Sequence, residues 1–331
     1  EGDNLVDIVV DSVLKASEHE NFYINDRDII GITESLVARA QGNYATAEDI
    51  AQDINKKFPG DIGIVFPILS RNRFSLILKG IAKSKKKIYL ILSYPSDEFG
   101  NHLMDIDKMD ELEINPHTDI LNEEEYRRLF GKEVFHPFTG IDYIKFYKNF
   151  AIDNNIEVYL ANDPRVVLRF TKDVLVANVH ERERTKRILK KAGAETLYGL
   201  DDILSSSIDG SGYNPKYGLY GSNKATEDKL KLFPRNCQYY VEEIQKRIKD
   251  ETGKNVEVMI YGDGAFKDPV GKIWELADPV VSPGYTKGLE GTPNEIKLKY
   301  LADNDLNDLD GDTMTTAIKK KIKEKEDNLF G

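Results

Sequence analysis

Apolar residues at the start of the chain recur at helical spacing: Leu5, Ile8, Val9 and Val13 share one face, which predicts an amphipathic helix. Residues 28–33 are predicted to form a buried strand that leads directly into a helix. The same patterns predict further helices over residues 34–40, 47–58, 70–83, 181–192, 235–252 and 313–327, two short helices capped by Asn122 and Asp142, and strands over residues 88–93, 157–161, 256–261 and 295–301.

The pattern predicts a strand, a helix and a second strand, in that order, over residues 173–179, 181–192 and 195–198. Two strands joined through a helix lie parallel, so a parallel sheet is predicted there. Residues 205–224 are rich in Gly, Ser and Asn, and residues 262–291 are rich in Gly and Pro, so both are predicted to be long loops. Loops of this length are usually functional or disordered.

The composition is that of a globular protein of about two domains. The chain has 331 residues and a formal net charge of −11, which argues against general nucleic-acid binding because phosphate backbones attract basic surfaces. Cys237 is the only cysteine, so no intrachain disulfide can form and a reducing, cytoplasmic location is expected. No apolar run approaches the ~20 residues of a membrane span, so no membrane partner is expected.

The loop over residues 205–224 carries the strongest candidate chemistry. Its glycines let the backbone approach a ligand, and Asp209 offers a hard oxygen ligand for Mg²⁺ or Mn²⁺. Ser211, Asn214 and Lys224 are candidate nucleotide contacts, because Lys224 offers a charge for phosphate. The alternative is a flexible surface loop with Asp209 in an ordinary turn.

A second candidate follows the strand over residues 256–261. Asp263 lies just past its carboxyl end, the edge at which α/β folds bind ligands, and Lys267 is placed to hold a phosphate. Asp-Gly is also a common turn signal, so a plain turn is the alternative.

Three weaker candidates lie at the starts of helices. The first comprises Glu34, Ser35 and Arg39, where a helix N-terminus attracts anions and Arg39 follows Ser35 by one turn. The others are the pair Arg71 and Arg73, suited to a substrate carboxylate or phosphate, and His180, which lies between a strand and a helix. The alternatives are a capped helix with a surface arginine, a solvated basic helix start and a capping histidine.

Two blocks of sequence, in this order along the chain, resemble the coenzyme F420 γ-glutamyl ligase family. One block is residues 1–7 with residues 28–42, and the other runs from Ser207-Ile-Asp-Gly-Ser211 through residues 251–254 to Asp263. The resemblance places Arg39 where the family has a phosphate-binding lysine, Glu34 and Ser35 at its nucleotide-contacting pair, and Asp209 in its Gly-Ile-Asp-Ala-Ser metal motif. Asp263 is carried over as the second metal ligand.

The resemblance implies a mixed α/β fold of the F420 γ-glutamyl ligase kind. Residues 1–60 and 162–331 would form the ligase-like core, with residues 61–161 as an inserted α/β subdomain. It also implies an amide ligase that uses GTP or ATP with Mg²⁺ or Mn²⁺ to join an amino acid, L-glutamate above all, to a carboxylate acceptor through an acyl phosphate. Asp209, Asp263 and Arg39 would be catalytic, and the implied assembly is a homodimer. The insertion favours an acceptor other than the F420 precursor.

Two other interpretations remain open on the sequence. A nucleotide- or metabolite-binding regulatory protein would bind nucleotide without releasing phosphate. A transferase acting on a phosphorylated metabolite would not need an amino acid.

Overall fold

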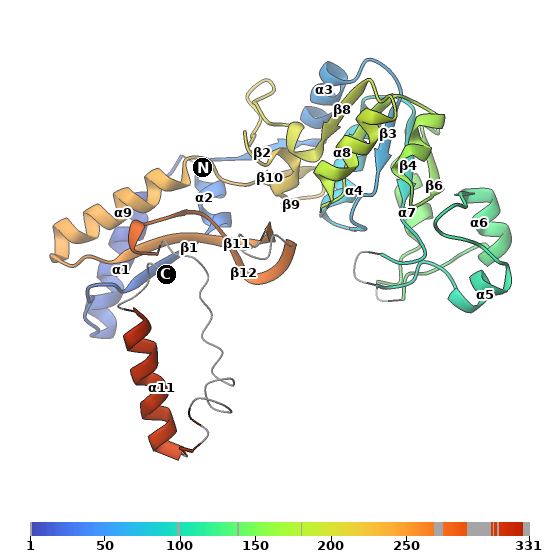
Figure 1. The fold of residues 1–331 in the computed structure, drawn as a ribbon. Helices are drawn as coiled ribbons and strands as arrows, with labels where there is room; N and C mark the ends of the chain where they lie inside the picture. Colours follow the sequence, from blue (N-terminus) through green and yellow to red (C-terminus); the bar gives the residue numbers. More distant parts are fainter. Residues whose placement is uncertain are drawn as a thin grey trace. The chain divides into compact units, whose positions relative to one another are not determined.

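A computed structural model describes residues 2–97, 100–137, 139–179, 181–267, 274–289, 306, 308–309 and 311–326 (Figure 1). The chain divides into two compact units. One comprises residues 1–9 and 32–237, and the other comprises residues 10–31 and 238–331. The mixed α/β fold that the sequence predicts is confirmed. Within the described residues, no helix is both long and apolar enough to cross a membrane.

The first unit is built around a six-stranded sheet. Five of its strands run parallel, and a short edge strand pairs antiparallel with its neighbour. In spatial order the strands are β5 (Leu121–Asn122), β6 (Ile156–Leu160), β4 (Ile88–Leu92), β3 (Ile62–Val65), β7 (Asp173–Val176) and β8 (Thr196–Gly199).

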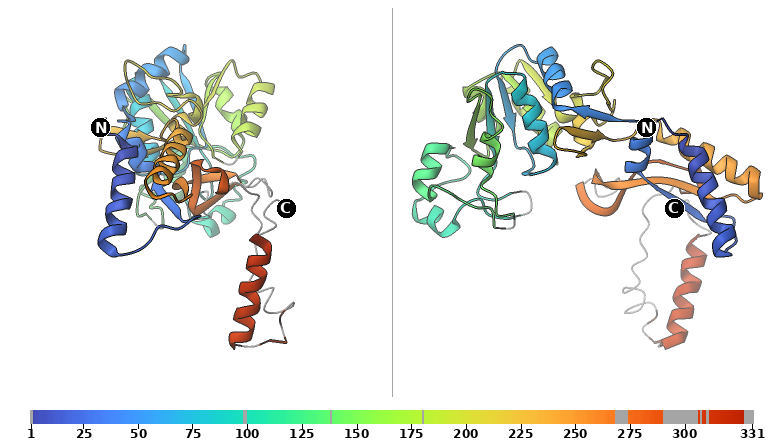
Figure 2. Two further views of the ribbon diagram at one scale, coloured as in Figure 1. Left: turned by 90° about the vertical axis from the view of Figure 1, so that its left-hand side faces the viewer. Right: turned by 180° about the vertical axis from the view of Figure 1, so that it is seen from behind.

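Helices cover both faces of this sheet, because its strands are apolar on both sides (Figures 1 and 2). Ile64 and Leu90 belong to a core cluster with α3 (Ala47–Lys57), α4 (Arg73–Lys83) and α7 (Tyr143–Lys148). On the other face, Val65 and Ile91 pack with the 3-10 helix η1 (Pro164–Arg169) and with α8 (Arg182–Lys191). Gly63 faces this second layer, where an added Cβ would lie 2.1 Å from Val167 Cγ2.

The six-stranded sheet continues past residue 161, the predicted end of the inserted segment. β7 and β8 follow that boundary, yet β7 pairs with β3 through parallel register, for example Ile64 with Leu175. Each strand needs its neighbours for its backbone hydrogen bonds, so residues 62–199 form one α/β segment. The predicted parallel pairing of residues 173–179 with 195–198 is confirmed.

A small antiparallel sheet is formed by strands that precede and follow this segment in the sequence. β10 (Lys229–Leu232) pairs with β2 (Tyr44–Thr46) on one side and with β9 (Ser222–Lys224) on the other. The helix α2 (Glu34–Ala40) precedes β2, as predicted. The predicted long loop over residues 205–224 therefore ends in the short 3-10 helix η3 (Gly218–Gly221) and a strand.

A third sheet has the order β1 (Ile29–Thr33), β11 (Glu257–Lys267), β12 (Trp274–Tyr285). The prediction of a loop over residues 262–291 is wrong there, since β11 and β12 form a long antiparallel ribbon. β12 contains Pro279 and Pro283. An edge strand tolerates proline, but in a sequence pattern proline indicates a loop. The chain also forms α1 (Leu5–Glu20), α9 (Cys237–Thr252) and α11 (Gly311–Glu326), close to the predicted helices, whereas the strand predicted over residues 295–301 lies outside the described residues.

The two short helices begin at the predicted caps. Asn122 closes a capping box with Glu125 at the start of α6 (Glu123–Phe130), and the Asp142 side chain accepts the Lys145 N–H at the start of α7. The helix α5 (Ile106–Glu111) was not predicted. Asp142 is 6% exposed and accepts hydrogen bonds from both terminal nitrogens of Arg127.

The Asp142–Arg127 pair makes the free energy of unfolding depend on pH in the acid range. Burial alone would raise the pKa of Asp142, but hydrogen bonds from Arg127 and two backbone amides hold it below its usual value. The folded pKa lies below the unfolded pKa of about 3.9, so the stabilisation is present above about pH 4 and is lost as pH falls further. We expect Asp142→Asn to cost about 2 kcal/mol at pH 7 and the difference from wild type to shrink by pH 3 in urea denaturation. A difference that is constant from pH 7 to pH 3 would contradict this.

Candidate functional site

The loop that contains Asp209 forms a tight two-residue turn. Asp209 and Gly210 have φ angles of 47° and 87°, the positive values that a type I′ turn requires. The turn is closed by the Ser211 N–H donating to the Ile208 carbonyl at 2.8 Å, while Ser211 Oγ accepts the Ile208 N–H at 3.0 Å. Asp209 is exposed at its tip. Within the described residues, no hydrogen bond or ion pair engages its carboxylate, so both oxygens are available to a cation.

Backbone contacts fix this turn against the start of β2. The Gly212 N–H donates to the Tyr44 carbonyl at 2.7 Å, and the Tyr213 N–H donates to Asn43 Oδ1 at 2.9 Å. Arg235 donates to the same Asn43 oxygen and to the Tyr213 carbonyl. Asn43 is fully buried, and nothing in the sequence pattern singled it out. The exposed Asp209 is therefore carried by a rigid base.

Gly212 has no room for a side chain. An added Cβ would lie 2.5 Å from the Tyr44 nitrogen and 2.7 Å from the Asn43 carbonyl carbon, which are backbone atoms that cannot rotate away. We expect Gly212→Ala to lower the free energy of unfolding by about 1–3 kcal/mol and to displace the turn, as measured by urea denaturation and by turnover. Gly60→Ala is the matched control, because Gly60 does not have a positive φ and an added Cβ there would meet only the Asp173 side chain, at 3.2 Å. Equal losses in the two variants would contradict the prediction.

The predicted residues at the start of α2 contact a lysine that sequence reasoning missed. Thr33 caps the helix, Glu34 is 6% exposed, and Ser35 is half-buried. Lys231 Nζ from β10 lies 3.3 Å from Glu34 Oε2 and is 2.6 Å from Ser35 Oγ. Lys231 lies opposite Tyr44 in the β10–β2 ladder, so long-range pairing brings this cation to α2. Only the alternation of residues 229–232 hinted at a strand here.

The remaining basic candidates of this region differ in their surroundings. Arg39 is exposed in the last turn of α2, one turn from Ser35, and no group in the described part of the chain engages its guanidinium. Lys224 forms an ion pair with the exposed Glu227 at 2.5 Å. Solvent screens such pairs, so Lys224 can exchange this partner for a phosphate at little cost.

Two predicted nucleotide contacts and the lone cysteine are committed to the fold. Asn214 is buried, donates to the carbonyls of Phe233 and Pro234, and accepts the N–H groups of Lys216 and Tyr217. The Ser211 hydroxyl is held within its own turn. Burial raises the pKa of Cys237 to about 12, and the nearby Glu34 carboxylate adds to this effect. The thiol is therefore protonated at neutral pH, as expected of a structural cysteine.

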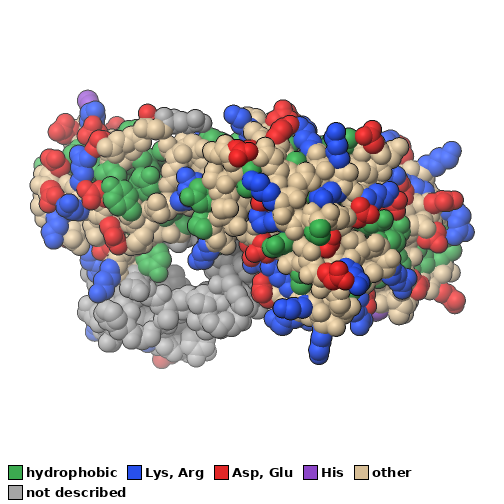
Figure 3. Space-filling model, turned by 90° about the horizontal axis from the view of Figure 1, so that it is seen from above, with side chains coloured by type: hydrophobic (Ala, Val, Ile, Leu, Met, Phe, Trp, Pro, Cys, Tyr) green, Lys and Arg blue, Asp and Glu red, His purple; other side chains and the backbone are tan. Residues whose placement is uncertain are grey.

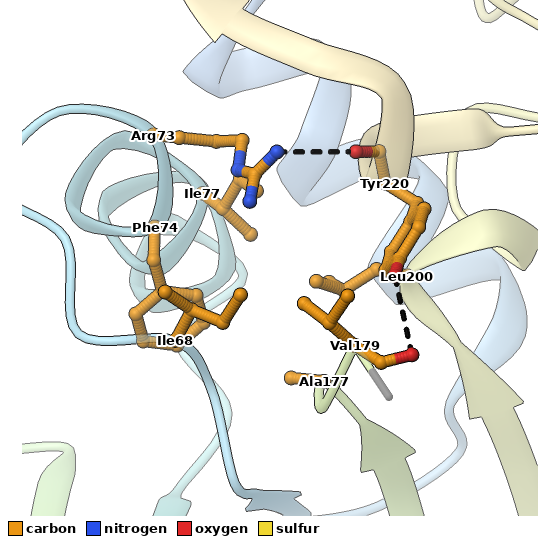
Figure 4. Close-up of a pocket in the computed structure, with 8 residues that line it drawn as sticks. All are labelled: Ile68, Arg73, Phe74, Ile77, Ala177, Val179, Leu200 and Tyr220. Atoms are coloured by element: carbon orange, nitrogen blue, oxygen red, sulfur yellow. Dashed lines mark hydrogen bonds between the residues drawn. The ribbon is translucent and has the colours of Figure 1, made fainter. Parts of the chain in front are cut away.

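Arg73 lies beside a small apolar void instead of an open substrate pocket (Figure 4). Its Nη1 donates to the Tyr220 carbonyl at 3.4 Å, and the Tyr220 hydroxyl donates to the Val179 carbonyl at 3.2 Å. The void is about 10 Å³, too small for more than a water molecule. Arg71 is exposed, and His180 lies outside the described residues.

The predicted metal ligands belong to different units of the chain. Asp209 is in the first unit, and the backbone of Asp263 is in β11 of the second; the side chains of Asp263 and Lys267 lie outside what the structure describes. Among the described residues, no group of three or more His, Cys, Asp or Glu side chains gathers as a metal site. Asp209 still fits Mg²⁺, which commonly binds through one or two carboxylates, substrate phosphates and water.

On the face shown in Figure 3, basic and acidic side chains alternate over much of the described surface. The described part of this face therefore shows no broad positive field. This agrees with the net charge of −11.

The family comparison covers the chain almost from end to end. Residues 1–327 match the model of the family described as F420-0:Gamma-glutamyl ligase. No curated protein and no solved structure is significantly similar to the chain. Because the match includes the α/β segment as well as the Asp209 turn and α2, the chain belongs to the F420-0:gamma-glutamyl ligase family, a family of enzymes.

Proposed function

We propose that this protein is a nucleoside-triphosphate- and metal-dependent amide ligase that joins L-glutamate to a carboxylate acceptor through an acyl phosphate. The observation that carries the proposal is the Asp209 turn. By its sequence resemblance this turn corresponds to the family's metal motif, and it presents an exposed carboxylate with no partner in the described structure, on a base fixed by Asn43 and Arg235. An exposed, unpaired acidic side chain on a rigid turn is suited to a ligand cation rather than to packing.

The reaction has two steps. A carboxylate oxygen of the acceptor attacks the γ-phosphorus, and the nucleoside diphosphate leaves with the electrons of the broken P–O bond. The amine nitrogen of glutamate then attacks the carbonyl carbon, phosphate leaves, and the nitrogen gives up its proton to solvent. Positioning and charge neutralisation are the main tasks of the protein in such a reaction.

The chain's own residues can perform these tasks. Arg39 and Lys224 lie within reach of solvent on the same unit as Asp209 and are proposed to orient phosphate oxygens. Lys231, paired with Glu34 and Ser35, places a further cation at the start of α2. When bound at Asp209, Mg²⁺ or Mn²⁺ would offset charge on the phosphates.

The remaining assignments rest on the sequence. Asp263 is proposed as a second metal ligand, and Glu34, Ser35 and Lys267 as nucleotide contacts. Arg71 and His180 are proposed to hold substrate carboxylates. Ser211, Asn214 and Arg73 are left out of the proposal, because hydrogen bonds within the fold engage their side chains. The protein is further proposed to act as a homodimer on a small-molecule acceptor.

Nucleotide binding provides the direct test. We expect GTP or ATP with Mg²⁺ or Mn²⁺ to raise the melting temperature by about 5 °C at a hundredfold excess over Kd, because a ligand of the folded state stabilises it by about 2.7 kcal/mol at that concentration. Phosphate release should then require both glutamate and acceptor. Nucleotide binding without any release would favour a regulatory protein, and release without an amino acid would favour a transferase. No shift with either nucleotide would contradict the proposal.

A further inference from the structure

The largest unexplained feature of the α/β segment is a cavity of about 300 Å³. It is lined by the chain that follows β3, β4, β6 and β7, together with the first turns of α8. All four strands are parallel, so their carboxyl ends meet at one edge of the sheet. The cavity is within the size range of small-molecule sites, and none of the proposed ligase residues that the structure describes lines it.

The cavity lies where the sheet changes its direction of winding. Going along the chain, β3 is followed by β4 and β6 toward one edge, and the chain then returns to place β7 and β8 on the other side of β3. Helices on both faces leave a crevice at this point in open α/β sheets, and ligands bind in it. The position of the cavity therefore points to ligand binding independently of its lining.

The lining of the cavity combines apolar and polar residues. Phe66, Pro67 and Ile188 are among the apolar ones, which suit the face of a flat ring. Asn178 is among the polar ones, and its Oδ1 is buried without a hydrogen-bond partner, while its Nδ2 donates to Thr185 Oγ1 at 3.2 Å. A buried acceptor without a donor is costly, so a ligand hydroxyl or amine that reaches it would gain a strong contact.

A fixed carboxylate also lines the cavity. Asp97 accepts from the Asn101 N–H at 2.8 Å, and His136 Nε2 lies 2.9 Å from Asp97 Oδ2. The Thr139 N–H donates to His136 Nδ1, which leaves Nε2 as the ring nitrogen that donates to Asp97. His136 therefore acts as a positioning residue that holds an acidic acceptor against the cavity.

The lining does not suit a phosphate group. The chain after β3 reads Phe66-Pro-Ile-Leu-Ser70, without the glycines that let a backbone approach a pyrophosphate. Among the described lining residues, Arg184 is the one basic side chain, and it is paired with Glu181 at 2.5 Å. We propose that this cavity binds an uncharged ribonucleoside, with the base against the apolar lining residues and sugar hydroxyls donating to Asn178 Oδ1 and Asp97. The proposal does not depend on the assignment of the ligase residues that the structure describes.

Isothermal titration of the full chain with adenosine, guanosine, cytidine and uridine tests the proposal. At least one of them should bind with a Kd below about 1 mM. Ser93→Trp places an indole from the exposed rim into the cavity and should weaken that binding by about tenfold or more. Ser12→Trp, at an exposed position of α1 outside the cavity, is the matched control and should bind like wild type.

Three further titrations identify the ligand chemistry. The 2′,3′-dideoxy form of the bound nucleoside should bind at least about tenfold more weakly, because it lacks the sugar hydroxyls. Free ribose should also bind at least about tenfold more weakly, because it lacks the base. The nucleoside monophosphate should bind no more tightly than the nucleoside. Asn178→Leu removes the Oδ1 acceptor and should abolish the hydroxyl preference, and it replaces Ser93→Trp if that variant does not fold.

The proposal is overturned if none of the four nucleosides binds, or if binding survives both Ser93→Trp and Asn178→Leu, because the binding would then belong to another site. It is also overturned if removal of the hydroxyls has no effect, or if the monophosphate binds about tenfold more tightly than the nucleoside.

Discussion

Asp209→Asn is expected to lower turnover by about a thousandfold and to leave the melting temperature unchanged. Asparagine accepts the positive φ of 47° at this position, so the turn can form, and no described group loses a partner. The loss of one negative charge weakens the hold on a divalent ion, whose contribution to stabilising transition-state charge is several kcal/mol. Initial rates of phosphate release at saturating nucleotide, together with thermal melts, measure both effects.

Asp153→Asn is the matched control for this prediction. Asp153 is also exposed and also has a positive φ, 51°, but it lies in the turn before β6, outside the proposed site. It should retain full activity and stability. If Asp209→Asn is as active as Asp153→Asn, Asp209 holds no catalytic metal.

Lys231→Met is expected to destabilise the protein by about 3 kcal/mol. The methionine keeps the apolar stem on β10 but leaves Glu34, which is 6% exposed, without the cation 3.3 Å away. An unpaired buried carboxylate is costly. Urea denaturation at pH 7 measures the change in the free energy of unfolding.

The double variant Lys231→Met with Glu34→Gln separates structure from catalysis. If the two residues only stabilise the start of α2, the double variant should regain most of the lost stability and also its activity. If Lys231 also orients phosphate, stability should return while the KM for nucleotide stays raised. A double variant that is no more stable than Lys231→Met would show that the loss of stability does not come from breaking the Lys231–Glu34 ion pair.

Local patterns in the sequence were sufficient for most of the helices and for the parallel pairing of β7 with β8. The caps at Asn122 and Asp142 were predictable because a cap is formed within four residues of the chain. The Asp209 turn was predictable for the same reason, since Asp-Gly satisfies its positive φ angles without outside help.

The remainder depends on contacts between distant residues, which a single sequence does not display. Lys231 meets Glu34 across nearly two hundred positions, and Asn43 meets Tyr213 across a similar distance, so neither partner could be read from spacing. The extent of the six-stranded sheet could not be read from the sequence, because β3 is only four residues long and pairs with β7 more than a hundred positions later. The β11–β12 ribbon was missed because its prolines and glycines suggest loop until the partner strand is known.

The ladder between β2 and β10 has a consequence for how the protein folds. It joins Thr46 to Lys229 and so closes a loop that contains the whole six-stranded sheet. Closing a loop of disordered chain that long costs entropy, but the cost falls once the enclosed segment has become compact and brought its ends together. The β2–β10 pairing is therefore expected to form late, after the parallel sheet, and the Lys231–Glu34 contact would form with it. In this order of assembly, the cation at the start of α2 is in place only when the α/β segment is already folded.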